Sequence, residues 1–328
     1  MKRKSAGFFG VVCVVLTCIC FTSVCSWSAD KYPSRSIELV CGSSPGGGTD
    51  VGNRILAKYF EKYLKVPIVP VNKPGPSQMM MASYVATAKP DGYTIGFGSN
   101  AIVTAAITGQ ASGYKMEDIR PVCMISTFNT TISVPADSPW KTWQEFVEYA
   151  KKHPGTQYGH HGIGSGPYYR MEVLNKHNKL GLQGVPFKGE GELLPMLLGK
   201  HVPIAPLSPT SAREQAAAGR LRILFTFEDP ALDGFDKNIP CLSTFYGPNT
   251  PDIDTTIFVW MHRKTPEDIV QTIDQAVAKM IKDPDFIKDF KNASHPITYI
   301  NSKEVEKNLA QQMVRYKKAL DYLGLVKK

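Results

Sequence analysis

Cysteine is scarce in this sequence once the N-terminal stretch is set aside. Four of the seven cysteines fall within residues 1–28, and the other three are Cys41, Cys123 and Cys241. An odd number of widely spaced cysteines excludes a disulfide framework. One disulfide with one free thiol is an alternative, but we favour three buried thiols that pack as small apolar side chains.

Long apolar runs are also absent, except for one at the N-terminus. Three basic residues at 2–4 precede an apolar run at 8–24, and small and polar residues follow it. This order is typical of a secretory signal peptide, so we predict one over residues 1–28 and a mature protein in the periplasm. The run is short for a membrane anchor. None of its cysteines follows a small residue, which argues against a lipoprotein.

Charge of one sign is not concentrated anywhere in the chain. Loss of residues 1–28 would remove three basic residues and no acidic ones, which leaves 35 basic against 29 acidic residues. No nucleic-acid motif accompanies this excess. We therefore expect a solvated surface with a mild attraction for anionic ligands. The remaining length of about 300 residues suits two domains.

Catalytic and metal-binding patterns are missing as well. The sequence around Ser165 is not Gly-x-Ser-x-Gly, because Ile163 and Pro167 stand two residues away. His160 and His161 lack the partners that a zinc site would show. No nucleophile, base and orienting group occur together. The sequence predicts neither an enzyme nor a cofactor or metal site.

One stretch is prominent, a strand followed by a glycine turn and a helix. The apolar run 37–41 ends at Gly42, and apolar residues recur at helical spacing over 51–64. Backbone N–H groups of such a turn and of the helix start can bind an anion. The candidate residues of this first glycine turn are Pro45, Gly46, Gly47, Gly48, Thr49 and Asp50.

Nucleotide motifs do not fit the first glycine turn. A Walker loop would need lysine after Gly48, and a dinucleotide fingerprint would need glycine in place of Val51. A site for a small anion and a tight turn without any ligand are the alternatives that the turn alone leaves open.

The pattern of strand, loop and helix repeats after this turn. Strands are expected at 66–71 and 93–98 with a helix at 79–88 between them, and Ser99 and Asn100 follow the second strand. These repeats indicate an α/β domain with a parallel sheet. Ligands bind at the carboxyl ends of such strands, and both the first glycine turn and Ser99–Asn100 lie there.

A second α/β unit is expected from residue 121 to about 225, with C-terminal helices after it. It contains a second glycine turn, residues 158–167, ahead of another helical pattern. Its candidate ligand contacts are His160, His161, Gly162, Gly164 and Ser165, and later strands and helices add Lys188 and Ser208.

Together these segments resemble the extracytoplasmic solute receptors (TctC-like) of tripartite tricarboxylate transporters. The resemblance covers nearly the whole mature chain and rests on seven motifs in order. They are Tyr32-Pro33…Ile37, Pro45–Asp50, Asn72-x-Pro74-Gly75, Pro90–Thr94, Gly162-x-Gly164-Ser165, Pro186–Gly189 and Ala218–Arg222. The resemblance implies a type II Venus flytrap with a hinge crossed twice. Lobe I would span 30–127 and 250–328, and lobe II 128–249.

The resemblance also implies a function. A small carboxylate ligand, either a di- or tricarboxylate or an aromatic carboxylate, would be held in the cleft by backbone N–H groups of both glycine turns. A monomeric receptor would deliver it to a membrane permease. A sensor for a membrane receptor, or an enzyme on the same fold, are the alternatives. The sequence departs from the family at His160–His161 and Tyr168. It also lacks an aspartate at 205–208, so we expect a ligand without a cationic amine.

Side chains could add to the backbone donors. The hydroxyls of Thr49, Ser99 and Ser165 and the amide of Asn100 could hydrogen-bond a carboxylate that leaves water. Lys188 is a candidate cation, or else an ordinary surface lysine. His160 or His161 could contact a second carboxylate or an aromatic ring, with a solvent-facing pair as the alternative.

Overall fold

The computed structural model describes residues 32–326, except residues 47, 248 and 294. The predicted signal peptide and Gly47 therefore lie outside the described residues. Within the described part of the chain, no helix has both the length and the apolar character that crossing a bilayer requires. The described residues from Arg35 onward belong to one compact unit.

A five-stranded sheet occupies the first part of this unit. Its strand order is β2-β1-β3-β10-β4, with β1 (Ile37–Cys41), β2 (Ile68–Asn72), β3 (Thr94–Ser99), β4 (Ile119–Phe128) and β10 (Thr255–His262). The pairs of β1 with β2 and β3 are parallel, as predicted. Strand β10 is antiparallel to both of its neighbours, which the sequence did not predict.

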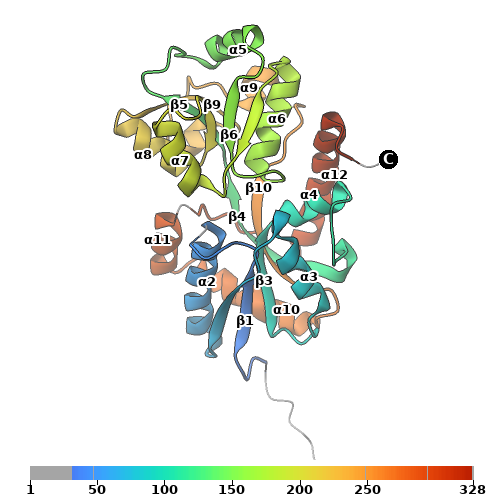
Figure 1. Cartoon of the computed structure of the whole chain (residues 1–328). Coiled ribbons are helices and arrows are strands. Elements are labelled where there is room, and N and C mark those ends of the chain that lie inside the picture. The colour runs from blue at the N-terminus through green and yellow to red at the C-terminus, as the bar shows by residue number, and fades with distance from the viewer. Residues whose placement is uncertain (1–31, 47, 248, 294, 327–328) are drawn as a thin grey trace, which may run out of the picture. The chain divides into compact units, whose positions relative to one another are not determined.

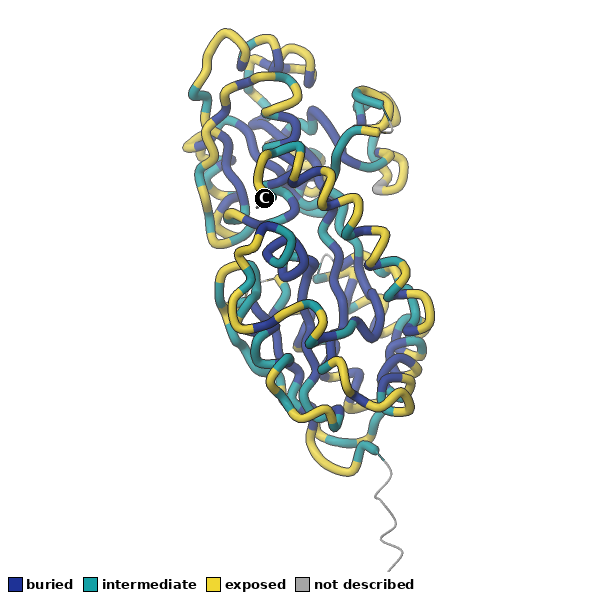
Figure 2. Tube along the Cα trace, turned by 90° about the vertical axis from the view of Figure 1, so that its right-hand side faces the viewer, coloured by how far each residue is buried: buried dark blue, intermediate teal, exposed yellow. Residues whose placement is uncertain are grey.

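Helices pack around this sheet. They are α2 (Gly48–Leu64), α3 (Met79–Thr87), α4 (Ala101–Ile107), α10 (Glu267–Met280), α11 (Pro284–Asn292) and α12 (Val305–Leu323), with short 3-10 turns η1 (Pro76–Gln78) and η2 (Met116–Asp118). Ile37 and Leu39 point to one face of β1 and Val40 to the other, and all three are fully buried. Helices therefore cover both faces of the sheet, and Figure 2 shows the buried residues gathered in the interior of the trace.

The second part of the unit contains two smaller sheets. One is three-stranded, in the order β8-β5-β9, and the other is a parallel pair of β6 and β7. The strands are β5 (Thr131–Pro135), β6 (Gln157–His160), β7 (Gln183–Pro186), β8 (Ala205–Leu207) and β9 (Leu221–Thr226). Strand β5 is antiparallel to β8 and to β9. Each part of the unit thus contains one strand, β10 or β5, that is antiparallel to both of its neighbours.

The helices of this second part pack around their own core. They are α5 (Trp143–Lys152), α6 (Gly166–Asn178), α7 (Glu190–Leu198), α8 (Pro209–Ala217) and α9 (Leu242–Tyr246), with the 3-10 turn η3 (Pro230–Asp233). Thr142 caps α5 by accepting a hydrogen bond from the Glu145 N–H, as the sequence pattern predicts. Trp143 and Phe146 then face a buried cluster that includes Phe225.

We call the five-stranded sheet with α2–α4 and α10–α12 lobe I, and strands β5–β9 with α5–α9 lobe II (Figure 1). The chain passes from lobe I to lobe II between β4 and β5, and it returns between α9 and β10. Two crossings make a hinge in which both connections must move together.

Arg170 on α6 binds both crossings. Its side chain has no exposed surface. Its guanidinium donates to the Thr130 Oγ1 at 3.1 Å on the first crossing and to both Asp252 carboxylate oxygens at 2.8 Å on the second. A third acceptor is Glu228 at 2.9 Å. Burial acts to lower the pKa of Arg170, but Asp252 and Glu228 outweigh it and raise the pKa, so the side chain stays charged.

The three cysteines that follow the predicted signal peptide are buried free thiols. The sequence-based preference for small apolar packing residues over a disulfide is therefore confirmed for Cys41, Cys123 and Cys241.

Candidate functional site

The described part of the first glycine turn is held in shape by Asp50, its last residue. The Asp50 carboxylate is buried and accepts hydrogen bonds from the Gly46 N–H at 2.9 Å, the Asn72 amide at 2.8 Å and Arg54 Nε at 3.0 Å. Burial acts to raise the pKa of Asp50, but these donors outweigh it and lower the pKa. The prediction of Asp50 as a ligand contact is corrected, because its carboxylate faces into the protein.

The start of α2, at the end of this turn, keeps its backbone donors available. Pro45, Gly46 and Gly48 are exposed and Thr49 is half-buried. Gly48 and Thr49 are the first residues of α2, where N–H groups have no acceptor within the helix. These N–H groups are the donors that an anion would meet first.

His295 contacts the start of α2, and no pattern in the sequence predicted this contact. Its Nε2 lies 3.0 Å from the Gly48 carbonyl oxygen, and its ring packs against Phe128 and Phe290. Burial lowers the pKa of His295, so the ring is neutral and donates from Nε2 to that carbonyl. The start of α2 is thereby tied to the loop after α11.

The amide of Asn100 is used by the fold, whereas the assignment of the Ser99 hydroxyl as a ligand contact stays a prediction. The Ser99 N–H donates to Gln78 Oε1 at 2.8 Å, so the η1 turn covers it. The Asn100 amide is buried and donates to the Asp254 carbonyl oxygen at 2.8 Å and to the Tyr316 hydroxyl at 2.7 Å. Both partners of Asn100 come from distant parts of the chain.

The second glycine turn joins β6 to α6. Ser165 caps α6, since its Oγ accepts from the Tyr168 N–H at 3.3 Å and donates to the Gly162 carbonyl oxygen at 2.8 Å. The His160 Nδ1 accepts from the Gly162 N–H at 3.2 Å, and its ring is buried beside Tyr168. His160 is therefore part of the fold, which corrects both the ligand contact and the solvent-facing alternative.

His161, Glu190 and Ser208 meet on lobe II. The Ser208 N–H and Oγ donate to the two Glu190 carboxylate oxygens at 2.6 and 2.7 Å. His161 Nε2 lies 3.8 Å from the same carboxylate. Burial lowers the pKa of His161 against the opposing effects of Glu190 and the Pro206 carbonyl, so the ring is neutral at pH 7. The sequence placed Ser208 at the site but missed Glu190.

Lys188 lies at the edge of this group. The residue is exposed, and its N–H donates to the Glu192 carboxylate at 2.8 Å. Its exposure agrees with the alternative of a surface lysine and still permits contact with a ligand.

The second glycine turn faces lobe I at the η1 turn. Gly164 is buried with φ +89°, and a Cβ atom there would lie 2.6 Å from the Ser77 Oγ. Only glycine fits a backbone with this φ at so close an approach. The two lobes therefore approach each other at Gly164 and Ser77, in addition to the packing of α6 against α12.

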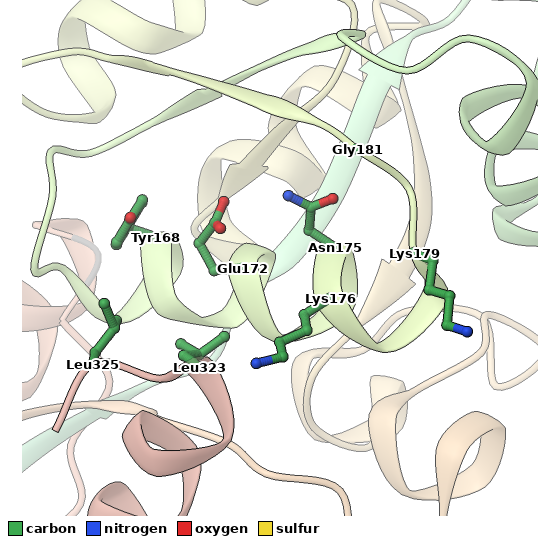
Figure 3. A pocket seen from close by; sticks show the side chains of 8 residues that line it. All are labelled: Tyr168, Glu172, Asn175, Lys176, Lys179, Gly181, Leu323 and Leu325. Carbon is green, nitrogen blue, oxygen red and sulfur yellow. The ribbon is translucent and has the colours of Figure 1, made fainter.

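Two cavities of the described part of the chain lie elsewhere. One of about 380 Å³ is lined by α6 residues that include Tyr168, Glu172 and Lys176, and by Leu323 and Leu325 (Figure 3). Another of about 430 Å³ lies beside β1 and α3. Neither is lined by a glycine turn, so they are not the predicted site.

Replacing Asp50 with asparagine should lower the free energy of unfolding by about 1–3 kcal/mol at pH 7, because Gly46 and Arg54 lose a charged acceptor. The folded pKa of Asp50 is lowered. Its stabilisation is therefore complete above the unfolded pKa of about 3.9 and is lost as the pH falls through the folded value. Denaturant unfolding should show a difference from wild type that is full at pH 7 and shrinks by pH 3. Asp91→Asn, at a carboxylate that is 39% exposed and pairs with Arg35 at the surface, is the control. A difference that does not depend on pH would contradict this role.

Comparison with known proteins identifies the class. The model of the tripartite tricarboxylate transporter family receptor matches residues 53–325. The UPF0065 protein in the gbd 5' region of Cupriavidus necator is 30% identical over 301 residues, which cover 91% of this chain and 90% of that protein.

Solved structures agree with this match. A TctC solute-binding protein from Polaromonas superposes with a TM-score of 0.71 at 26% identity and covers 88% of this chain and 99% of its own. R. palustris Rpa4515, solved with adipate, gives a TM-score of 0.78 at 23% identity over 90% of this chain and 99% of its own.

The fold is therefore that of a two-lobed periplasmic binding protein of type II, which confirms the predicted α/β Venus flytrap. The chain belongs to the tripartite tricarboxylate transporter receptor family. Members of this family are receptors for transport and not enzymes.

Proposed function

We propose that this protein is a periplasmic solute receptor that captures a small carboxylate between its lobes and delivers it to a membrane permease. The observation that supports this most is the approach of the second glycine turn to lobe I at Gly164 and Ser77. It gives a ligand at the first turn a route to contact both lobes. A ligand that touches both lobes favours the closed form by its differential affinity.

The carboxylate is bound by main-chain donors in this proposal. On lobe I they are the N–H groups of Gly48 and Thr49 at the start of α2, with the Thr49 hydroxyl beside them. On lobe II they are the N–H groups of Ile163 and Gly164, because those of Gly162 and Ser165 donate to His160 Nδ1 and to the Gly162 carbonyl oxygen. Lys188 supplies a cation at the rim. Charge-assisted bonds from N–H groups hold an anion without a buried counter-charge. Adipate in the R. palustris relative is a ligand of the same class.

The remaining parts of the proposal follow from the family and the sequence. Residues 1–28 direct export to the periplasm and are removed. Lobe I spans 30–127 and 250–328, and lobe II spans 128–249. No catalytic step is assigned to the chain, and it acts as a monomer.

Titration calorimetry with a panel of small mono-, di- and tricarboxylates tests this function. We expect at least one member to bind with a dissociation constant near 1 μM, about −8 kcal/mol, and to be recovered unchanged afterwards. Amides of the same acids are the control and should bind at least tenfold more weakly. Absence of binding by every carboxylate, or chemical turnover of one, would contradict the proposal.

A further inference from the structure

Three loops of lobe II converge on one carboxylate. His161 follows β6, Glu190 begins α7 after β7, and Ser208 caps α8 after β8. All three residues therefore stand at the carboxyl ends of their strands, the edge at which α/β sheets bind ligands. Gly164, three residues from His161, is the point at which this edge meets lobe I.

Glu190 takes the position that a bound anion would otherwise take. Both of its oxygens accept hydrogen bonds from Ser208 at the N-terminus of α8. A helix N-terminus with a free N–H group and a hydroxyl is an anion site. Here the protein's own side chain fills it, so a carboxylate of the ligand cannot bind there as well.

The charge of Glu190 has no cation bound to it among the described residues. Its nearest basic group is His161 Nε2 at 3.8 Å, beyond hydrogen-bond distance. His161 Nε2 is itself buried and has no hydrogen-bond partner among the described residues.

His161 Nε2 and the Glu190 carboxylate thus lie 3.8 Å apart with no hydrogen bond between them. The Glu190 side chain is 22% exposed and the His161 side chain 19% exposed. A second carboxylate on a ligand would be repelled there. An ammonium group would supply both the missing charge and the missing donors.

We propose that Glu190, with His161 beside it, is a specificity determinant. It binds a cationic amine of the ligand and excludes a second carboxylate. The ligand is then a zwitterion, with its carboxylate at the first glycine turn and its ammonium group at Glu190. This inference rests on the proposed carboxylate-binding function. It reverses the expectation drawn from the missing aspartate at 205–208, because Glu190 brings a carboxylate to Ser208 from another strand end.

The test compares ω-amino carboxylates with α,ω-dicarboxylates of the same length, from three to six carbons, by titration calorimetry. The wild type should bind the best amino carboxylate at least tenfold tighter than the matching dicarboxylate. Glu190→Gln keeps the shape and an acceptor oxygen for Ser208, and it should reduce this preference at least tenfold. Glu192→Gln removes the same charge two residues along α7 and should keep the preference.

The outcomes separate the inference from the function on which it rests. If dicarboxylates bind the wild type as tightly as amino carboxylates, or if Glu190→Gln leaves the preference unchanged in a protein with wild-type thermal unfolding, the role of Glu190 is wrong while carboxylate binding stands. If no carboxylate of either series or of the wider panel binds, the proposed function itself fails.

Discussion

Replacing Arg170 with alanine should lower the free energy of unfolding by about 3–5 kcal/mol. The guanidinium is fully buried and joins Thr130 on one hinge crossing to Asp252 on the other. Its loss would leave the half-buried Asp252 and Thr130 without their donor. The change also removes the packing of the guanidinium on the Phe227 ring, 4.7 Å from its centroid.

Denaturant unfolding with a matched surface control measures this effect. Arg263→Ala removes a guanidinium that is 46% exposed and pairs with Glu306, and such a surface pair contributes about 0–1 kcal/mol. Arg170→Lys should recover only part of the loss, since an ammonium cannot bind Asp252 through two parallel hydrogen bonds. If Arg170→Ala unfolds within about 1 kcal/mol of wild type, Arg170 does not hold the hinge.

Replacing Gly164 with alanine should weaken ligand binding at least tenfold. The new Cβ would lie 2.6 Å from the Ser77 Oγ, and φ at this position is +89°. The second glycine turn would have to retreat from lobe I, which separates its N–H groups from a ligand bound at the first turn. Misplacing donors in this way removes charge-assisted hydrogen bonds from the bound state only.

Gly155→Ala is the matched control for that change. Gly155 has the same φ of +89° with no atom within 4 Å of the new Cβ. Both variants carry the same backbone strain, about 1–3 kcal/mol, but only Gly164→Ala meets lobe I. Calorimetry should show near-wild-type affinity for Gly155→Ala and partial recovery when Ser77→Gly is added to Gly164→Ala. Equal affinities for the two alanine variants would show that the contact with Ser77 is irrelevant to binding.

Local patterns predicted the elements well. The strand, glycine turn and helix at residues 37–64 appear as β1 and α2, because apolar periodicity and glycine act over a few residues. The antiparallel directions of β5 and β10 were not predictable in this way. They depend on how the chain returns across the hinge, which no short window records.

The contacts within the candidate site could be predicted from the sequence even less well than the strand directions. Asn100 lies at a strand end where a ligand contact is reasonable. Its amide, however, donates its hydrogen bonds to Asp254 and Tyr316. The Ser99 N–H likewise donates a hydrogen bond to Gln78. These partners lie far along the chain, so the sequence could name the loops of the site but not which of their donors remain free.

The structural role of Asp50 is visible in the local sequence. Asp50 is followed by Arg54 at the spacing of a helical ion pair, and it stands where an acid can accept from the N–H groups of its own turn. Glu190 resembles Asp50 in its position, because it begins a helix directly after the Lys188–Gly189 turn. The positions proposed for the ligand and the lobe boundaries stay predictions.

Small-angle scattering during titration of the tightest-binding carboxylate tests the central claim most directly. If this ligand draws the lobes together, the radius of gyration should fall as binding saturates, with the same midpoint as the calorimetric titration. The Gly164→Ala variant should show a smaller fall at saturation. A radius of gyration that stays constant while the carboxylate binds would contradict capture by lobe closure.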